Sequence, residues 1–193
     1  MKHADALVIA ETLLKEMRPY CHRVEIAGSI RRLKSEVKDI EIVAIPKWES
    51  VAAGFFAEDV SSNNSLYCRW AMGHPWITWI KAGTNQIQPW NIKEDGKYWR
   101  GLIASSHCPE NETKLDLFLT TPEQFGILMV IRTGPESFSK KIVTQSSKGG
   151  WLPDHLRVDG GWLMDGDRRI PTPTELSVFD AIGRPWIPPE KRV

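Results

Sequence analysis

The sequence has little cysteine, no long apolar run and no excess of charge of either sign. Its three cysteines, Cys21, Cys68 and Cys108, form no tight pairing pattern, and nothing at the N-terminus resembles a signal peptide, so we expect reduced thiols in an intracellular protein. No segment approaches the roughly 20 apolar residues that cross a bilayer, which predicts no membrane contact. The net charge of +1 argues against a purely electrostatic nucleic-acid binder, so any such contact would need a local basic patch.

The sequence does contain clear helical and strand patterns, in a chain of 193 residues that can bury a core without disulfides. Apolar side chains recur at helical spacing over residues 4–17, and Pro19 ends the pattern. Residues 22–28 and 38–46 alternate as half-buried strands on either side of a helical turn. For residues 55–108, which hold five of the nine tryptophans, we predict short antiparallel strands in no readable order.

The last third predicts a compact α/β unit. Residues 113–119 alternate as a strand and lead into a helix, for which Thr121 fits the N-cap, Gln124 completes a capping box and Gly134 fits the end. Further along, we predict a short helix ended by a glycine pair (135–150), small hairpin strands (155–173), and a last helix (176–183) preceded by a capping box of Thr172 and Glu175.

Two carboxylates stand at alternate positions of a predicted strand. Asp39 and Glu41 point to one face while Ile40 and Ile42 enter the core. Carboxylates this close repel each other, and a hard divalent cation such as Mg²⁺ or Mn²⁺ removes that penalty. Asp116 offers a third carboxylate on another strand, and such a trio can hold two ions about 4 Å apart for in-line phosphoryl displacement.

A glycine-serine pair lies between the first two predicted strands. Gly28 and Ser29 open the turn "SIRRL", where backbone N–H groups, a hydroxyl and a nearby arginine can bind phosphate oxygens. This turn therefore predicts a site for the triphosphate of a nucleotide.

These motifs carry a family resemblance. "GSIRR", "DIEIV", "KLDLFL", "RTGPESF" and "PTPTELSVFDAIGRPWIPPEKR", in this order, resemble the family X DNA polymerases, the polymerase beta-like group of the nucleotidyltransferase superfamily. The resemblance covers residue 4 to the C-terminus except the tryptophan-rich middle. It implies an α+β fold: a catalytic palm of residues 1–121, with a mixed sheet flanked by helices, and a small thumb-like α/β subdomain of residues 122–193.

The resemblance also implies site residues and substrates. The counterparts of Asp39, Glu41 and Asp116 bind two Mg²⁺ ions, and that of Asp116 helps deprotonate the primer 3′-hydroxyl. The implied activity is nucleotidyl transfer from a nucleoside triphosphate to primed or gapped DNA by a monomeric repair-type polymerase. The N-terminal lyase domain of longer members has no counterpart here, so no lyase activity is expected. The remaining expected contacts are Gly28, Ser29 and Arg32 to the triphosphate, Thr133 and Gly134 to the sugar and base, and Lys140, Lys141 and Lys148 to DNA phosphates.

Several positions depart from the family pattern. Glu41 stands where a second aspartate is usual, and its longer side chain would shift the metal geometry. Ile131 and Arg132 replace aromatic residues beside the sugar, which leaves the choice between ribose and deoxyribose open. Ser139 and Val143 replace residues that touch base or template, so template fidelity also stays open.

Other interpretations of the same residues remain. The enzyme could be a template-independent transferase that modifies nucleic acid, a protein or a small molecule, or the chain could be a catalytically weak nucleotide- or DNA-binding module. Asp39 and Glu41 by themselves could be solvent-facing strand residues, and the three lysines a solvated helix face. Arg31 reads as a salt-bridging residue, and Arg32 as the phosphate contact.

The tryptophans, and the cysteines and histidines that could bind zinc, each allow two interpretations. The tryptophans could stack on exposed bases, but they more often fill a core. Cys68, His74, His107 and Cys108 follow no zinc-ligand spacing, so a buried thiol and hydrogen-bonded histidines are the favoured interpretation.

Overall fold

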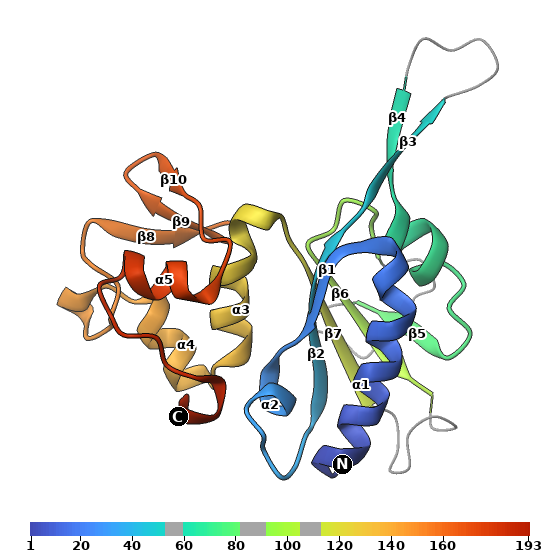
Figure 1. The fold of residues 1–193 in the computed structure, drawn as a ribbon, viewed down its shortest axis with the longest axis horizontal. Coiled ribbons are helices and arrows are strands. Elements are labelled where there is room, and N and C mark those ends of the chain that lie inside the picture. Colours follow the sequence, from blue (N-terminus) through green and yellow to red (C-terminus); the bar gives the residue numbers. More distant parts are fainter. Residues whose placement is uncertain (53–59, 82–91, 105–112) are drawn as a thin grey trace.

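The computed structural model describes residues 1–52, 60–81, 92–104 and 113–193. It has two lobes, and helix α3 lies between them (Figure 1). We call residues 1–121 the N-terminal lobe and residues 122–193 the C-terminal lobe.

The N-terminal lobe is built on one mixed five-stranded sheet with the order β1-β2-β7-β6-β5. Only β2 and β7 pair in parallel, and the other neighbours are antiparallel. The sheet and its helices confirm the α+β class predicted from the sequence. The strands are β1 (Cys21–Ile26), β2 (Asp39–Pro46), β5 (Ile77–Ile80), β6 (Tyr98–Ile103) and β7 (Thr113–Leu119).

One face of this sheet is covered by helix α1 (His3–Met17) and the short helix η2 (Tyr67–Ala71), which the sequence did not predict. Ile40 and Ile42 of β2 point to this face, as their alternation predicts. The described tryptophans Trp70, Trp79 and Trp99 are buried here, in edge-to-face contact with ring centroids 6.0 Å apart. They are core residues, while Trp90 lies outside the described residues.

The opposite face of the sheet packs on α3 (Phe125–Thr133), which follows the short helix η4 (Pro122–Gln124). Val43 and Phe118 from adjacent strands meet Phe125 and Met129 there. Since Val43 shares its side of β2 with Glu41, and Phe118 shares its side of β7 with Asp116, the acids also face the C-terminal lobe.

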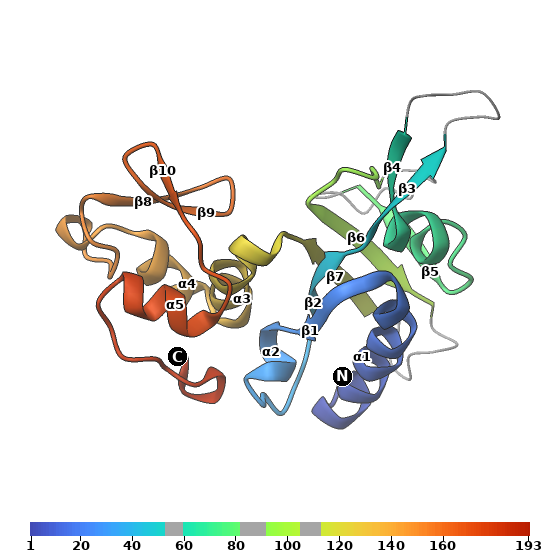
Figure 2. The same cartoon turned by 45° about the horizontal axis from the view of Figure 1, so that its top comes forward.

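The C-terminal lobe has its own core between helices and a small antiparallel sheet of order β10-β9-β8 (Figure 2). The three strands confirm the hairpins predicted in this region. The elements are α4 (Glu136–Val143), η5 (Ser146–Lys148), β8 (Leu156–Asp159), β9 (Trp162–Asp165), β10 (Arg168–Ile170), α5 (Glu175–Ala181) and η6 (Pro189–Lys191).

A two-stranded ribbon and two short helices complete the N-terminal lobe. Strands β3 (Trp48–Ala52) and β4 (Val60–Asn64) form an antiparallel ribbon that projects away from the main sheet (Figure 1). The short helices are η1 (Arg18–Tyr20) and α2 (Gly28–Arg31).

Three predicted helix ends were wrong in detail. Thr121 is an N-cap but its side chain makes no capping bond, because η4 separates it from α3. The last capping box joins Thr174 and Ser177 instead of Thr172 and Glu175, since Thr172 is fully buried and Glu175 pairs with arginines. Helix α4 ends at Val143, well before the glycine pair.

Candidate active site

The three predicted acids lie on two neighbouring strands. Glu41 of β2 is the direct register partner of Asp116 of β7, and Asp39 is paired with Lys114. Residues opposite each other in adjacent strands, on one face, have neighbouring side chains. The structure therefore brings Asp39, Glu41 and Asp116 together, as predicted.

The acids perturb one another electrostatically. Burial, followed by repulsion from Asp39 and Asp116, raises the pKa of Glu41 to about 7. Burial and the charge of Asp116 likewise raise the pKa of Asp39. A divalent cation relieves this kind of repulsion between buried carboxylates.

Asp116 is held by two residues of β6. Arg100 donates from Nε to Oδ1 (2.6 Å) and from Nη2 to Oδ2 (2.8 Å), and the Tyr98 hydroxyl donates to Oδ1 (2.6 Å). Each carboxylate oxygen has two acceptor positions, so Oδ2 keeps one for a further ligand. The sequence analysis missed both residues, although the alternation in "YWR" places them on one side of a strand.

The donor chemistry fits a divalent cation, although the geometry is not that of a formed metal site. In the described parts of the chain, no three His, Cys, Asp or Glu side chains are gathered closely enough to hold a metal ion. The carboxylate of Asp116 is instead bound by Arg100 and Tyr98. Cation binding by Asp39, Glu41 and Asp116 therefore requires Asp116 to share its carboxylate or to exchange partners.

The glycine-serine turn packs directly on the acids. Gly28 has φ +64°, and a Cβ atom there would lie 2.1 Å from Oε2 of Glu41. Glycine adopts this left-handed backbone without strain, and its lack of a Cβ atom leaves the space that Glu41 occupies. The Ser29 hydroxyl is buried without a hydrogen-bond partner among the described residues. Because α2 has only four residues, its helix dipole is small, and anion binding here depends on side chains.

A pocket of about 390 Å³ opens beside this turn. Ser29, Ser35 and Asp39 are among its lining residues. The exposed lysines Lys34 and Lys38 also line it, and neither was predicted as a site residue. The recurrence of basic residues in "RRLKSEVK" could have indicated them. The full lining is Ser29, Arg32, Lys34, Ser35, Glu36, Lys38 and Asp39.

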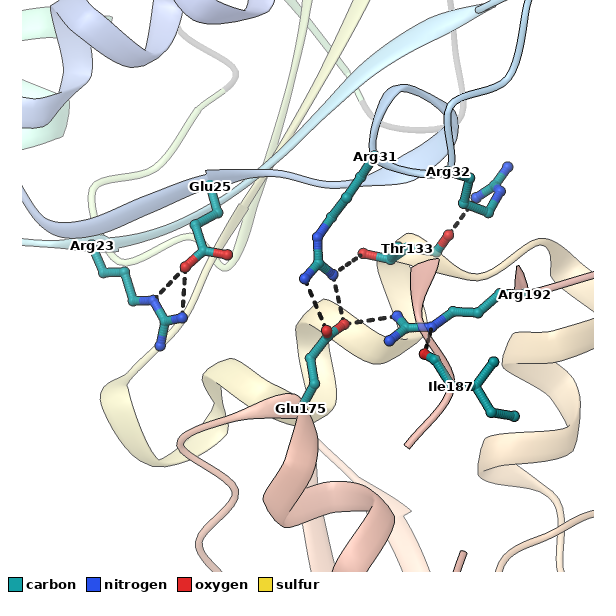
Figure 3. Close-up of polar contacts among 8 residues, drawn as sticks. All are labelled: Arg23, Glu25, Arg31, Arg32, Thr133, Glu175, Ile187 and Arg192. Atoms are coloured by element: carbon teal, nitrogen blue, oxygen red, sulfur yellow. Dashed lines mark hydrogen bonds and ion pairs between the residues drawn. The ribbon is translucent and has the colours of Figure 1, made fainter. Parts of the chain in front are cut away.

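Arg31 and Arg32 face the other lobe (Figure 3). Arg32 donates from Nη1 to the carbonyl oxygen of Thr133, and burial lowers its pKa despite the nearby acids. Arg31 donates to the Thr133 hydroxyl (3.1 Å) and forms two hydrogen bonds with Glu175 (2.6 and 2.9 Å). Thr133 thus lies beside the turn that carries Arg31 and Arg32, and Arg31 forms the salt bridge expected of it.

Glu175 joins a second arginine from the C-terminus. Arg192, which is fully buried, donates to Oε1 of Glu175 (2.7 Å) and to the carbonyl oxygen of Ile187 (3.0 Å) (Figure 3). Burial alone would raise the pKa of Glu175, but the hydrogen bonds from Arg31 and Arg192 hold that pKa below its usual range.

The contacts described for the remaining predicted residues are with other parts of the C-terminal lobe. Gly134 ends α3 as predicted, and a Cβ atom there would lie 2.5 Å from the Phe138 ring. Lys140 pairs with Glu136 (2.6 Å) at exposed positions of α4, while Lys141 lies over the Trp151 ring. Lys148 is exposed in η5. No described contact links these three lysines into one patch.

The residues considered for zinc do not form a site in the described chain. His74 is hydrogen-bonded to Glu16 (3.0 Å), and the Cys68 thiol faces Glu94. His107 and Cys108 lie outside the described residues.

Comparisons with protein-family models and with curated proteins give no match for this chain. Among the helices of the described residues, none is both long and apolar enough to cross a membrane.

Proposed function

We propose that the protein transfers a nucleotide from a (deoxy)nucleoside triphosphate to the 3′-hydroxyl of primed or gapped DNA, with two Mg²⁺ ions, as a small family X-type polymerase. The observation that carries the proposal is the register of Glu41 with Asp116, next to a basic pocket with Ser29 and Arg32. Three carboxylates beside an anion pocket are the components that phosphoryl transfer needs.

The residues of the site divide into a group that would bind phosphate and a group that would bind cations. Ser29, Arg32, Lys34 and Lys38 would bind the phosphate oxygens, and Asp39, Glu41 and Asp116 would hold the cations. The bound cations would supply activation of the attacking oxygen and stabilisation of the leaving pyrophosphate.

In this reaction, the 3′-hydroxyl loses its proton, its oxygen bonds to the α-phosphorus, and the bond to pyrophosphate breaks. Asp116 would accept that proton, and the open acceptor position of its Oδ2 supports this role. Tyr98 and Arg100 fix the orientation of this carboxylate.

The test is primer extension on gapped DNA with Mg²⁺ and all four deoxynucleotides. We expect Asp116→Asn to lower product formation at least about 100-fold, and Asp180→Asn, a change of an exposed aspartate of α5, to leave it unchanged. Equal background product from wild type and Asp116→Asn would overturn the proposal in favour of a binding module. Extension that ignores the template sequence would favour a template-independent transferase.

A further inference from the structure

A second pocket lies on the other face of the sheet. It has a volume of about 400 Å³ and opens between the end of α1 and the segment from η2 to Trp76. Helix α1 covers the face that carries Ile40 and Ile42, so this pocket is separate from the acids and from the proposed function. Its lining is Glu16, Tyr20, Arg69, Trp70, Met72, Gly73, His74, Pro75 and Trp76.

A carboxylate is fixed in the wall of this pocket. Oε2 of Glu16 accepts hydrogen bonds from Nε1 of Trp70 (3.2 Å) and from Nε2 of His74 (3.0 Å). Both donor side chains are about 95% buried, whereas the Glu16 side chain is 35% exposed. Two donors fill the acceptor positions of Oε2 and leave Oε1 for a ligand.

The charge of Glu16 has no lysine or arginine partner in the described parts of the chain, where its carboxylate is held by the hydrogen bonds from Trp70 and His74. Arg69 borders the same pocket, but its guanidinium is paired with Glu49 (2.6 Å). The pocket therefore presents negative charge at a fixed place.

Aromatic rings surround this carboxylate. The His74 ring lies edge-on between the rings of Trp70 and Trp76, with centroids 4.8 Å from each. Tyr20 adds a further aromatic side chain to the wall. Aromatic rings and a carboxylate attract organic cations, because ring faces and the anion both favour positive charge. An anion would be repelled, and an uncharged apolar ligand would gain nothing from the carboxylate.

We propose that this pocket binds an alkylammonium group, with Oε1 of Glu16 as its counter-ion and Tyr20 and Trp76 as its walls. Such a group is found both in polyamines and in the lysine side chains of proteins. The position of the pocket, away from the catalytic acids, makes it a site for an accessory ligand of this class.

The experiment follows the indole N–H signals of ¹⁵N-labelled full-length protein during titration at constant ionic strength. The probes are tetramethylammonium chloride, spermidine and Nα-acetyl-lysine amide. The control is tert-butanol, an uncharged molecule similar in size to tetramethylammonium. We expect the Trp70 signal, assigned with Trp70→Phe, to shift saturably with the cations and not with tert-butanol. Tighter binding of spermidine than of the lysine derivative would indicate a polyamine, and the reverse order a protein partner.

Variants separate the ligand site from the fold. Glu16→Gln should weaken binding at least about tenfold, whereas Glu11→Gln, on an exposed position of the same helix, should not. If Glu16→Gln has a much lower melting temperature than wild type, Arg69→Gln still tests the proposal. Removal of this nearby positive charge should tighten binding of the cations about threefold. Equal shifts with tert-butanol, or unchanged affinity in both Glu16→Gln and Arg69→Gln, would overturn the proposal.

Discussion

Arg31 and Glu175 are joined by two hydrogen bonds of 2.6 and 2.9 Å, although they come from different lobes. Arg31 immediately precedes Arg32, which lines the pocket beside Ser29, and Glu175 also binds the buried Arg192. This ion-pair group fixes the C-terminal lobe against the turn that carries Gly28 and Ser29. The position of the second lobe is therefore coupled to the candidate active site.

We expect Glu175→Gln to lower the free energy of unfolding by about 3 kcal/mol, because it leaves the buried Arg192 without a counter-charge. Urea unfolding of wild type and variant measures this difference. The matched control is Asp167→Asn, which breaks the exposed pair with Arg157 and should cost less than about 1 kcal/mol. A cost for Glu175→Gln no larger than for the control would contradict the coupling.

The same carboxylate predicts an acid-dependent loss of stability. The folded-state pKa of Glu175 lies below the unfolded value of 4.5, so its stabilisation is complete above that value and is lost as the pH falls through the folded pKa. Wild type should therefore lose stability more steeply below pH 4.5 than Glu175→Gln. Urea midpoints measured at a series of acidic pH values test this, and parallel curves would count against it.

Glu41 predicts the opposite dependence in the absence of metal. Its folded-state pKa of about 7 lies above the unfolded value of 4.5, so stability falls as the pH rises between these values. Without divalent cations at pH 8, Glu41→Gln should be more stable than wild type by about 3 kcal/mol. Addition of Mg²⁺ should raise the melting temperature of wild type at pH 8 and leave that of Glu41→Gln nearly unchanged. A Mg²⁺ effect of equal size in both proteins would argue against cation binding at Glu41.

Gly28→Ala tests the contact between the turn and the acids. The new Cβ atom would collide with Oε2 of Glu41 in a backbone of φ +64°. Gly183→Ala is the matched control, because Gly183 has φ +67° and nothing within 4 Å of an added Cβ. The control should cost about 1 kcal/mol from backbone strain alone, and Gly28→Ala should cost more and abolish primer extension. Equal costs with retained activity would show that Glu41 moves aside freely.

The basic pocket predicts a specific loss of nucleotide affinity. If the proposed function holds, alanine substitution of both Lys34 and Lys38 should raise the KM for the nucleoside triphosphate about tenfold or more with a smaller change in kcat, because each substitution removes a charge that would bind phosphate. Steady-state extension kinetics measure both constants. Lys15→Ala, on the exposed side of α1, should leave KM unchanged. An unchanged KM in the double variant would remove the pocket from the nucleotide site.

Much of the fold could be predicted because its signals are local. The alternation of residues 38–46 and 113–119 placed β2 and β7, and the helical spacing of residues 4–17 placed α1. The tryptophan-rich middle could not be ordered, because its strands are short and η2 interrupts them. The predicted capping box with Glu175 was wrong because the Glu175 side chain binds Arg31 instead of the helix N-terminus.

The sequence by itself determined that Asp39 and Glu41 would lie on the strand face opposite to Ile40 and Ile42, and Asp116 on the face opposite to the leucines of its strand, because alternation along a strand depends only on neighbouring residues. Only the tertiary structure decided that Glu41 stands opposite Asp116, that Arg100 and Tyr98 hold that carboxylate, and that Glu175 binds two arginines. Strand pairing and long-range ion pairs depend on how the whole chain packs. No local pattern encodes which distant residues will meet.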